Sequence, residues 1–213
     1  MKIAILGSTG FVGKVLLDKA LKNGYQVKTL VRNPEKLGIY KDKLDFIQGD
    51  ITQPEKIKLC FDGVEAVLST VPPERNAKEP EKYTEIMKGL ITILESNNIK
   101  RFIHIGGAVH GGGEKENWTF GRKMLRFFLN LFWKQGLIAK QLEWEALRNS
   151  NLDWTLVRPP RIRPGKSKGK IVADEKNLST LEVYVDDLVD FMLEQIESKE
   201  WIKKAPLVAS VKK

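Results

Sequence analysis

Three glycines near the N-terminus have the spacing of a phosphate-binding turn. Gly7, Gly10 and Gly13 form a GxxGxxG pattern between a short apolar run and an amphipathic helical pattern. A strand-to-helix turn without bulky side chains lets the backbone approach a pyrophosphate closely, with its N–H groups pointing at the anion. The strand before the pattern and the helix after it favour this function over a glycine-rich turn that binds nothing. We expect dinucleotide binding by Gly7, Ser8, Thr9, Gly10, Phe11, Val12 and Gly13.

The residue that follows the second predicted strand bears on which dinucleotide is bound. Proteins that prefer NADH carry an Asp or Glu at this point, which accepts hydrogen bonds from the ribose hydroxyls. This chain carries Arg32 instead, and a guanidinium pairs well with a phosphate group. We therefore expect NADP(H) to be the cofactor. The alternative is that Arg32 is an ordinary surface arginine.

The end of the third predicted strand is a candidate site for the adenine. Asp50 would accept a hydrogen bond from the exocyclic amine, and Ile51 would pack on the ring. An Asp after a strand is also a common turn former or helix cap. Both roles therefore stay open for Asp50.

A parallel sheet is expected to position these groups. Short apolar runs rich in valine and isoleucine alternate with longer helical patterns, which predicts repeated βαβ units. We expect strands at residues 2–6, 25–31, 45–48, 65–69, 101–105, 154–158 and 207–209. The first helix lies between the first two strands, and later helices are expected at about 80–97, 137–149 and 186–198. The predicted fold class is α/β, a doubly wound, mostly parallel Rossmann-type sheet with helices on both faces. Residues 1–213 would form a single domain whose substrate crevice is completed by the C-terminal part.

The composition fits a globular protein with one core. Of 213 residues, 42% are hydrophobic and 30% are charged, far from the composition of a disordered chain. The single cysteine, Cys60, and two histidines leave little for a disulfide or a zinc site, so no metal is expected. The N-terminal apolar run is too short for a signal peptide, and we expect a cytoplasmic location. The net charge of +9 comes from scattered lysines, which indicates a solvated surface and no nucleic-acid partner.

Several short motifs occur in an order that is typical of one enzyme superfamily. After the glycine turn come Val31-Arg32-Asn33-Pro34, Gly49-Asp50-Ile51, Leu156-Val157-Arg158-Pro159 and Val185-Asp186-Asp187-Leu188. With them, the chain resembles the atypical short-chain dehydrogenase/reductases, in the NAD(P)H-binding group that includes biliverdin reductase B (flavin reductase) and the NmrA-like proteins. The resemblance covers nearly the whole chain except residues 108–138. It implies the fold and the cofactor but leaves the substrate open, because that group mixes reductases, isomerases and non-catalytic redox sensors.

The resemblance also implies where hydride transfer would take place. The nicotinamide would lie against residues that follow the fourth and fifth strands, namely Thr70, Val71, Gly106 and Gly107. Reductases of the superfamily use a Tyr-x-x-x-Lys pair after the fifth strand, but this chain has no tyrosine between Tyr83 and Tyr184. Two catalytic candidates remain, Lys140 on the following helix and His110 in the loop after the fifth strand. His104, inside that strand, is expected to be a core residue.

The missing tyrosine constrains the reaction. Reduction of an ordinary ketone requires a proton to be delivered to the developing alkoxide. A flavin, a quinone or an extended tetrapyrrole instead takes hydride into a delocalised system and obtains its proton from water. We therefore expect an NADPH-dependent oxidoreductase that acts on a planar, conjugated small-molecule acceptor. The alternative is a non-catalytic NADPH-binding redox sensor with a protein partner.

Residues 118–137 form an unusually aromatic segment. They include Trp118, Phe120, Phe127, Phe128, Phe132 and Trp133. The apolar run is too short to cross a bilayer, which takes about 20 residues, so no integral membrane span is expected. Four interpretations remain: core packing of a long helix, a wall of the substrate pocket, a homodimer contact, or peripheral membrane contact helped by nearby Lys and Arg residues.

Overall fold

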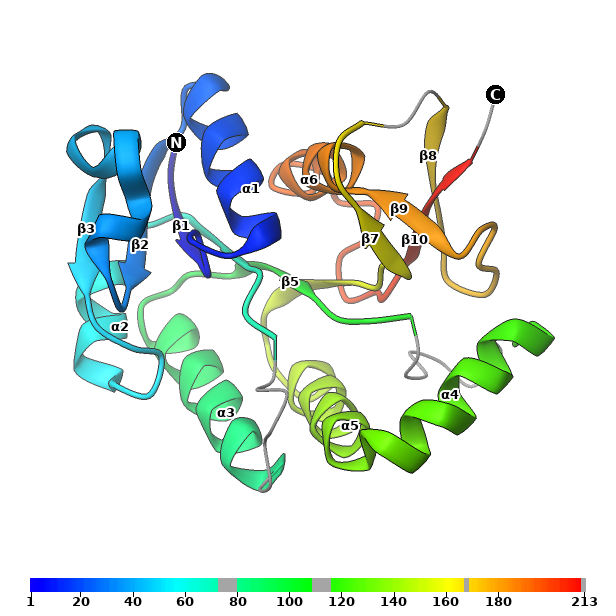
Figure 1. The fold of residues 1–213 in the computed structure, drawn as a ribbon. Coiled ribbons are helices and arrows are strands. Elements are labelled where there is room, and N and C mark those ends of the chain that lie inside the picture. Colours follow the sequence, from blue (N-terminus) through cyan, green and yellow to red (C-terminus); the bar gives the residue numbers. More distant parts are fainter. Residues whose placement is uncertain (73–79, 109–115, 167–168, 212–213) are drawn as a thin grey trace.

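A six-stranded parallel sheet forms the centre of the molecule (Figure 1). The computed structural model describes residues 1–72, 80–108, 116–166 and 169–211. The strand order is β3-β2-β1-β4-β5-β6, so the chain runs outward from β1 in one direction and then in the other. The strands are β1 (Lys2–Leu6), β2 (Gln26–Val31), β3 (Asp45–Gln48), β4 (Ala66–Ser69), β5 (Arg101–Ile105) and β6 (Asp153–Val157). The predicted doubly wound α/β fold is confirmed.

Helices cover both faces of the sheet because residues along each strand alternate between the two faces. Ile3 and Ile5 of β1 pack in one buried cluster with α1 (Phe11–Lys22) and α6 (Val185–Glu194). Ala4 and Leu6 pack in the other with α2 (Pro54–Phe61), α3 (Pro80–Ser96) and α5 (Lys134–Arg148). The thiol of Cys60 lies in this second cluster, and burial raises its pKa to about 12.

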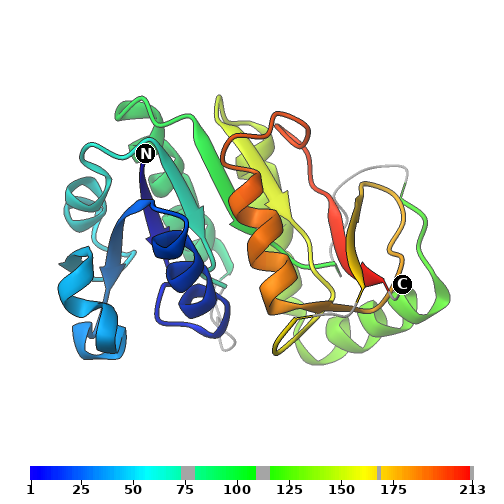
Figure 2. The ribbon, with the colours of Figure 1, turned by 90° about the horizontal axis from the view of Figure 1, so that it is seen from above.

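Additional strands extend the molecule beyond β6. Figure 2 shows β8 and β10 at the end of the molecule opposite β3. The antiparallel pair is β8 (Lys170–Asp174) with β10 (Leu207–Val211), and the parallel pair is β7 (Arg161–Arg163) with β9 (Glu182–Tyr184). The predicted last strand is thus present as β10, but it pairs with β8 and not within the six-stranded sheet.

Two further helical segments connect the main elements. The 3-10 segment η1 (Pro34–Lys43) follows β2, and α4 (Phe120–Phe132) precedes α5. Figure 1 shows α4 at the edge of the molecule, next to α5 and away from the central sheet. In the described part of the chain, no helix has the length and apolar character needed to cross a membrane.

Candidate functional site

The three glycines of the turn between β1 and α1 have different structural roles. Gly7 has a φ of +83°, and a Cβ atom there would lie 2.7 Å from Oγ1 of Thr70 at the end of β4. A Cβ on Gly13 would lie 1.9 Å from the carbonyl oxygen of Gly7, because α1 starts directly against the turn. On Gly10 the nearest atom would be the Gly7 oxygen at 3.3 Å. Gly7 and Gly13 are therefore required by the turn itself, whereas a side chain on Gly10 needs only a small adjustment of the turn.

The first turn of α1 is suited to an anion. Gly10 is the N-cap residue, no side chain caps the helix, and no acidic residue lies in its first turn. The first N–H groups of a helix have no acceptor within the helix and carry the positive end of its dipole. The N–H of Gly10 already donates to the Gly7 carbonyl oxygen at 2.9 Å. The backbone N–H groups of Phe11, Val12 and Gly13 are thus the donors that this turn offers to a pyrophosphate.

The hydroxyl of Ser8 is directed into the core. Its Oγ lies 2.7 Å from the hydroxyl of Thr29, and both residues are buried. A contact between Ser8 and a phosphate would therefore have to come from its backbone. Thr9, the next residue, is partly exposed, and its contact with phosphate stays a prediction.

A polar pocket lies at the end of β2 and β3, where the adenine and its ribose are expected. It is a shallow depression of about 440 Å³, open to solvent and lined by Arg32, Gln48, Gly49, Asp50, Thr52, Gln53 and Lys56. The side chain of Arg32 is 80% exposed, and its Nε lies 3.8 Å from Oδ2 of Asp50. Lys56 was not among the residues singled out from the sequence. It brings a second cation to this pocket from the first turn of α2.

Asp50 forms a turn in this structure. Its Oδ1 accepts a hydrogen bond from the N–H of Thr52 at 3.0 Å, and its own N–H donates to Oε1 of Gln53 at 2.9 Å. One carboxylate oxygen of Asp50 thus stabilises the turn, and the other oxygen points toward Arg32. Ile51 is partly buried against the core. Adenine contacts by Asp50 and Ile51 stay predictions.

The expected nicotinamide end lies where β4 and β5 end. These neighbouring parallel strands end at the same edge of the sheet, and they bring Thr70 and Val71 to the same side as Gly106 and Gly107. The Thr70 hydroxyl lies 3.2 Å from the Gly7 carbonyl oxygen, which joins this end to the glycine turn. His110 lies outside the described residues.

A buried polar cluster lies directly behind this edge. Its centre is Glu143 of α5, whose Oε1 accepts a hydrogen bond from the Tyr83 hydroxyl at 2.6 Å and lies 2.7 Å from Nε2 of His104. Nζ of Lys140 donates to Oε2 of Glu143 at 2.9 Å and lies 3.4 Å from the carbonyl oxygen of Ile105. His104 is a core residue, as predicted. Lys140 is also buried.

The electrostatics of the cluster keep Glu143 ionised. Burial alone would raise the pKa of Glu143, but the neighbouring Lys140, and then His104, outweigh it and hold this pKa below its ordinary value. Burial, followed by the Glu143 carboxylate, raises the pKa of Tyr83 well above its ordinary value. The proton of the Tyr83 hydroxyl is therefore held on Tyr83, and the charge of Lys140 is matched within the core.

Sequence reasoning missed Tyr83 and Glu143. Tyr83 lies on α3, far from Lys140 along the chain, so no local pattern joins them. Glu143 is three positions after Lys140 on α5, a spacing that places two side chains on one helix face. This spacing is the feature of the sequence that could have indicated the pairing of Lys140 with Glu143.

Comparisons with known proteins agree with this geometry. Residues 7–199 match the family model described as NAD(P)H-binding. The photosystem II assembly factor Ycf39 of Trieres chinensis is 33% identical over 106 residues, which cover 48% of this chain and 33% of that protein. Anthocyanidin reductase of Arabidopsis thaliana is 28% identical over 190 residues, 76% of this chain and 55% of that protein. The chain thus spans between a third and about half of these relatives.

Solved structures share the fold over nearly the whole chain. A short-chain dehydrogenase/reductase from Veillonella parvula, in complex with NADP, has a TM-score of 0.79 and 15% sequence identity. The alignment covers 98% of this chain and 94% of that one. At this identity the likeness concerns the fold, and in that protein the fold holds NADP.

Proposed function

The chain belongs to the NAD(P)H-binding family, and from that premise we propose that it is an NADPH-dependent oxidoreductase whose acceptor is a planar, conjugated molecule such as a flavin or quinone. The observation that carries the proposal is the open, uncapped start of α1 at Gly10, inside the residues that match the family. This backbone would hold the pyrophosphate, and Arg32 with Lys56 would hold the 2′-phosphate. The bound cofactor would supply hydride.

The buried cluster supports an acceptor that needs no protein acid. Tyr83 keeps its proton because its pKa is raised, and its hydroxyl donates to Glu143. Lys140 is paired with the same carboxylate. In the overall reaction, NADPH, the acceptor and one proton from water give NADP⁺ and the reduced acceptor. Delocalisation of the added electron pair in a flavin or quinone removes the need for a positioned proton donor.

NADPH oxidation in the presence of a panel of flavins, quinones, tetrapyrroles and simple ketones tests this proposal. We expect turnover with conjugated acceptors and little with ketones. In Lys140→Met, the kcat for a quinone should fall less than tenfold, because a general acid contributes about 10²- to 10⁴-fold and none is needed here. Circular dichroism checks that the variant is folded, and His110→Ala provides the same test for the second candidate.

The outcomes separate three hypotheses. Efficient ketone reduction that is lost in Lys140→Met or His110→Ala would contradict the proposed acceptor class and indicate acid-base catalysis. Cofactor binding without turnover on any acceptor would favour the non-catalytic sensor. Turnover with conjugated acceptors in all three proteins supports the proposal.

Cofactor preference is expected to depend on Arg32. Because a charge-assisted hydrogen bond contributes about 1.5–3 kcal/mol, Arg32→Ala should weaken NADPH binding roughly 10- to 150-fold and change NADH binding little. Lys56→Ala should act in the same direction, whereas Lys58→Ala, an exposed lysine on the same helix, should not. Isothermal titration calorimetry with both cofactors measures the effect. Equal affinities for NADPH and NADH in the unmodified protein would contradict the assignment.

A further inference from the structure

One face of α4 exposes a stripe of large apolar side chains. Phe120 is 78% exposed, and Phe127 and Leu131 are each 66% exposed. Met124 and Phe128 lie on the same face, since residues three and four apart on a helix are neighbours. We call these five residues the α4 stripe. Because these side chains are exposed, packing in the core is not the role of this face of the helix. Single apolar residues are common on protein surfaces, but a contiguous stripe of five marks an interaction site.

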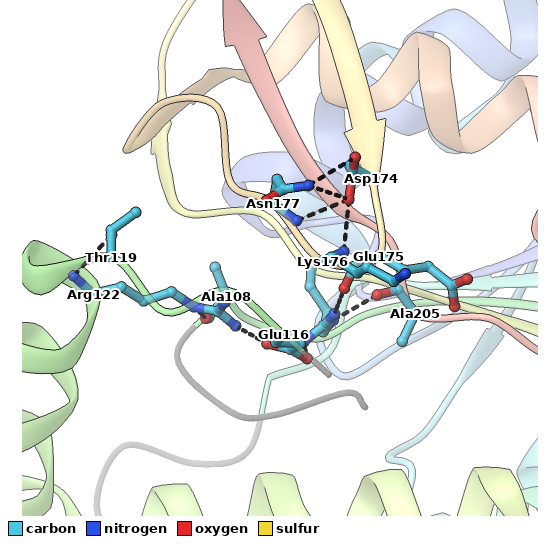
Figure 3. Close-up of polar contacts among 10 residues, drawn as sticks. Ala108, Glu116, Thr119, Arg122, Asp174, Glu175, Lys176, Asn177 and Ala205 are labelled. Atoms are coloured by element: carbon cyan, nitrogen blue, oxygen red, sulfur yellow. Dashed lines mark hydrogen bonds and ion pairs between the residues drawn. The ribbon is translucent and has the colours of Figure 1, made fainter. Parts of the chain in front are cut away.

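A buried ion-pair cluster fixes α4 to the body of the protein (Figure 3). Glu116 accepts from Arg122, in the first turn of α4, at 2.5 Å and from Arg158, just after β6, at 2.6 Å. The three side chains are only 1–2% exposed. Arg122 also donates a hydrogen bond to the carbonyl oxygen of Ala108. Its guanidinium carbon lies 3.9 Å from the centroid of the Trp118 ring, so the two groups stack. These contacts fix the N-terminal end of α4, which is also capped by the side chain of Thr119.

The charges of the chain segment that carries the stripe have one sign. Residues 117–142 contain no Asp or Glu. Lys123 and Arg126 lie on α4 outside the stripe, Lys134 follows the helix, and the whole chain carries a net charge of +9. In a two-fold symmetric contact through this face, a second copy would bring the same cations close together, whereas an anionic surface would be attracted by them.

We propose that the α4 stripe docks the protein onto an anionic lipid surface, with α4 lying in the plane of the headgroups. The helix has 13 residues and is therefore about 20 Å long, too short to cross a bilayer but sufficient to lie in one leaflet. Helices with aromatic and aliphatic residues on one face and Lys or Arg on the other bury their apolar face at the acyl boundary. This proposal rests on α4 and the cations near it and does not depend on the reductase function.

Vesicle flotation tests the proposal with matched variants. We expect the unmodified protein to float with phosphatidylcholine vesicles that contain about 30% phosphatidylglycerol, at least tenfold more than with pure phosphatidylcholine. Phe127→Glu combined with Leu131→Glu should abolish flotation. Ile39→Glu combined with Leu59→Glu is the control, because it changes the charge equally at positions that are 75% and 55% exposed on η1 and α2. Circular dichroism confirms that both double variants are folded.

Each other outcome contradicts the proposal. Equal loss of flotation in both double variants would indicate attraction by net charge alone. Absence of flotation, together with a dimer in sedimentation velocity that the α4 double variant dissociates, would assign the stripe to a second copy of the chain. Absence of both flotation and self-association would leave the α4 stripe without a lipid partner and would also overturn the proposal.

Discussion

Replacing Gly10 with valine is expected to abolish NADPH binding while the protein stays folded. A Cβ on Gly10 meets only the Gly7 oxygen at 3.3 Å, so a side chain fits with a small adjustment of the turn. The branched chain would occupy the space above the N-terminus of α1, where the pyrophosphate must approach the backbone N–H groups closely. We expect the Kd to rise on the order of 100-fold or more, which corresponds to roughly 3 kcal/mol.

Two comparison variants separate loss of binding from loss of structure. Gly89 lies on the exposed side of α3, where an added Cβ meets nothing within 4 Å, so Gly89→Val should keep NADPH binding. Gly13→Ala places its Cβ 1.9 Å from the Gly7 oxygen and should lower the melting temperature as well as binding. Calorimetry gives the affinities, and thermal unfolding gives the stability. An unchanged NADPH affinity in Gly10→Val would mean that the turn has a structural role only.

The parts of the fold that were predicted correctly depend on local patterns. The strands of the central sheet are short apolar runs between turn residues, and α1 follows directly from the spacing of its apolar positions. The GxxGxxG turn could be recognised because strand, turn and helix are consecutive in the chain. Even there, the sequence left the direction of the Ser8 hydroxyl undecided, because its partner Thr29 comes from the next strand.

The remaining features depend on contacts between distant segments. The cluster around Glu143 joins α3, β5 and α5, and each member reads as an ordinary helix or strand residue on its own. The apolar run of α4 does form a clear local pattern, but that pattern fits a buried helix and an exposed one equally well. Which of the two is realised depends on whether another element covers the stripe, and local spacing holds no information about that.

Glu143→Gln is expected to lower the free energy of unfolding by several kcal/mol. The substitution keeps the size of the side chain but removes the buried charge that faces Lys140 at 2.9 Å and His104 at 2.7 Å. Removing one partner of a buried ion pair costs about 3–5 kcal/mol, because the other charge remains desolvated and unmatched. For a protein of this size, that corresponds to a fall in melting temperature of roughly 6–20 °C. Glu145→Gln, at an exposed position of the same helix, should change the melting temperature little.

The pH dependence and a double variant identify the cause. The pKa of Glu143 is lowered in the folded protein from an ordinary value of 4.5, so its contribution to stability is present above that value and is lost as the pH falls below it. The difference in unfolding free energy between the unmodified protein and Glu143→Gln should therefore shrink below pH 4.5. Adding Lys140→Met to Glu143→Gln should recover part of the loss, since the unmatched ammonium is then absent. A constant difference at every pH, together with additive effects of the two substitutions, would show that packing, and not the ion pair, holds this part of the core together.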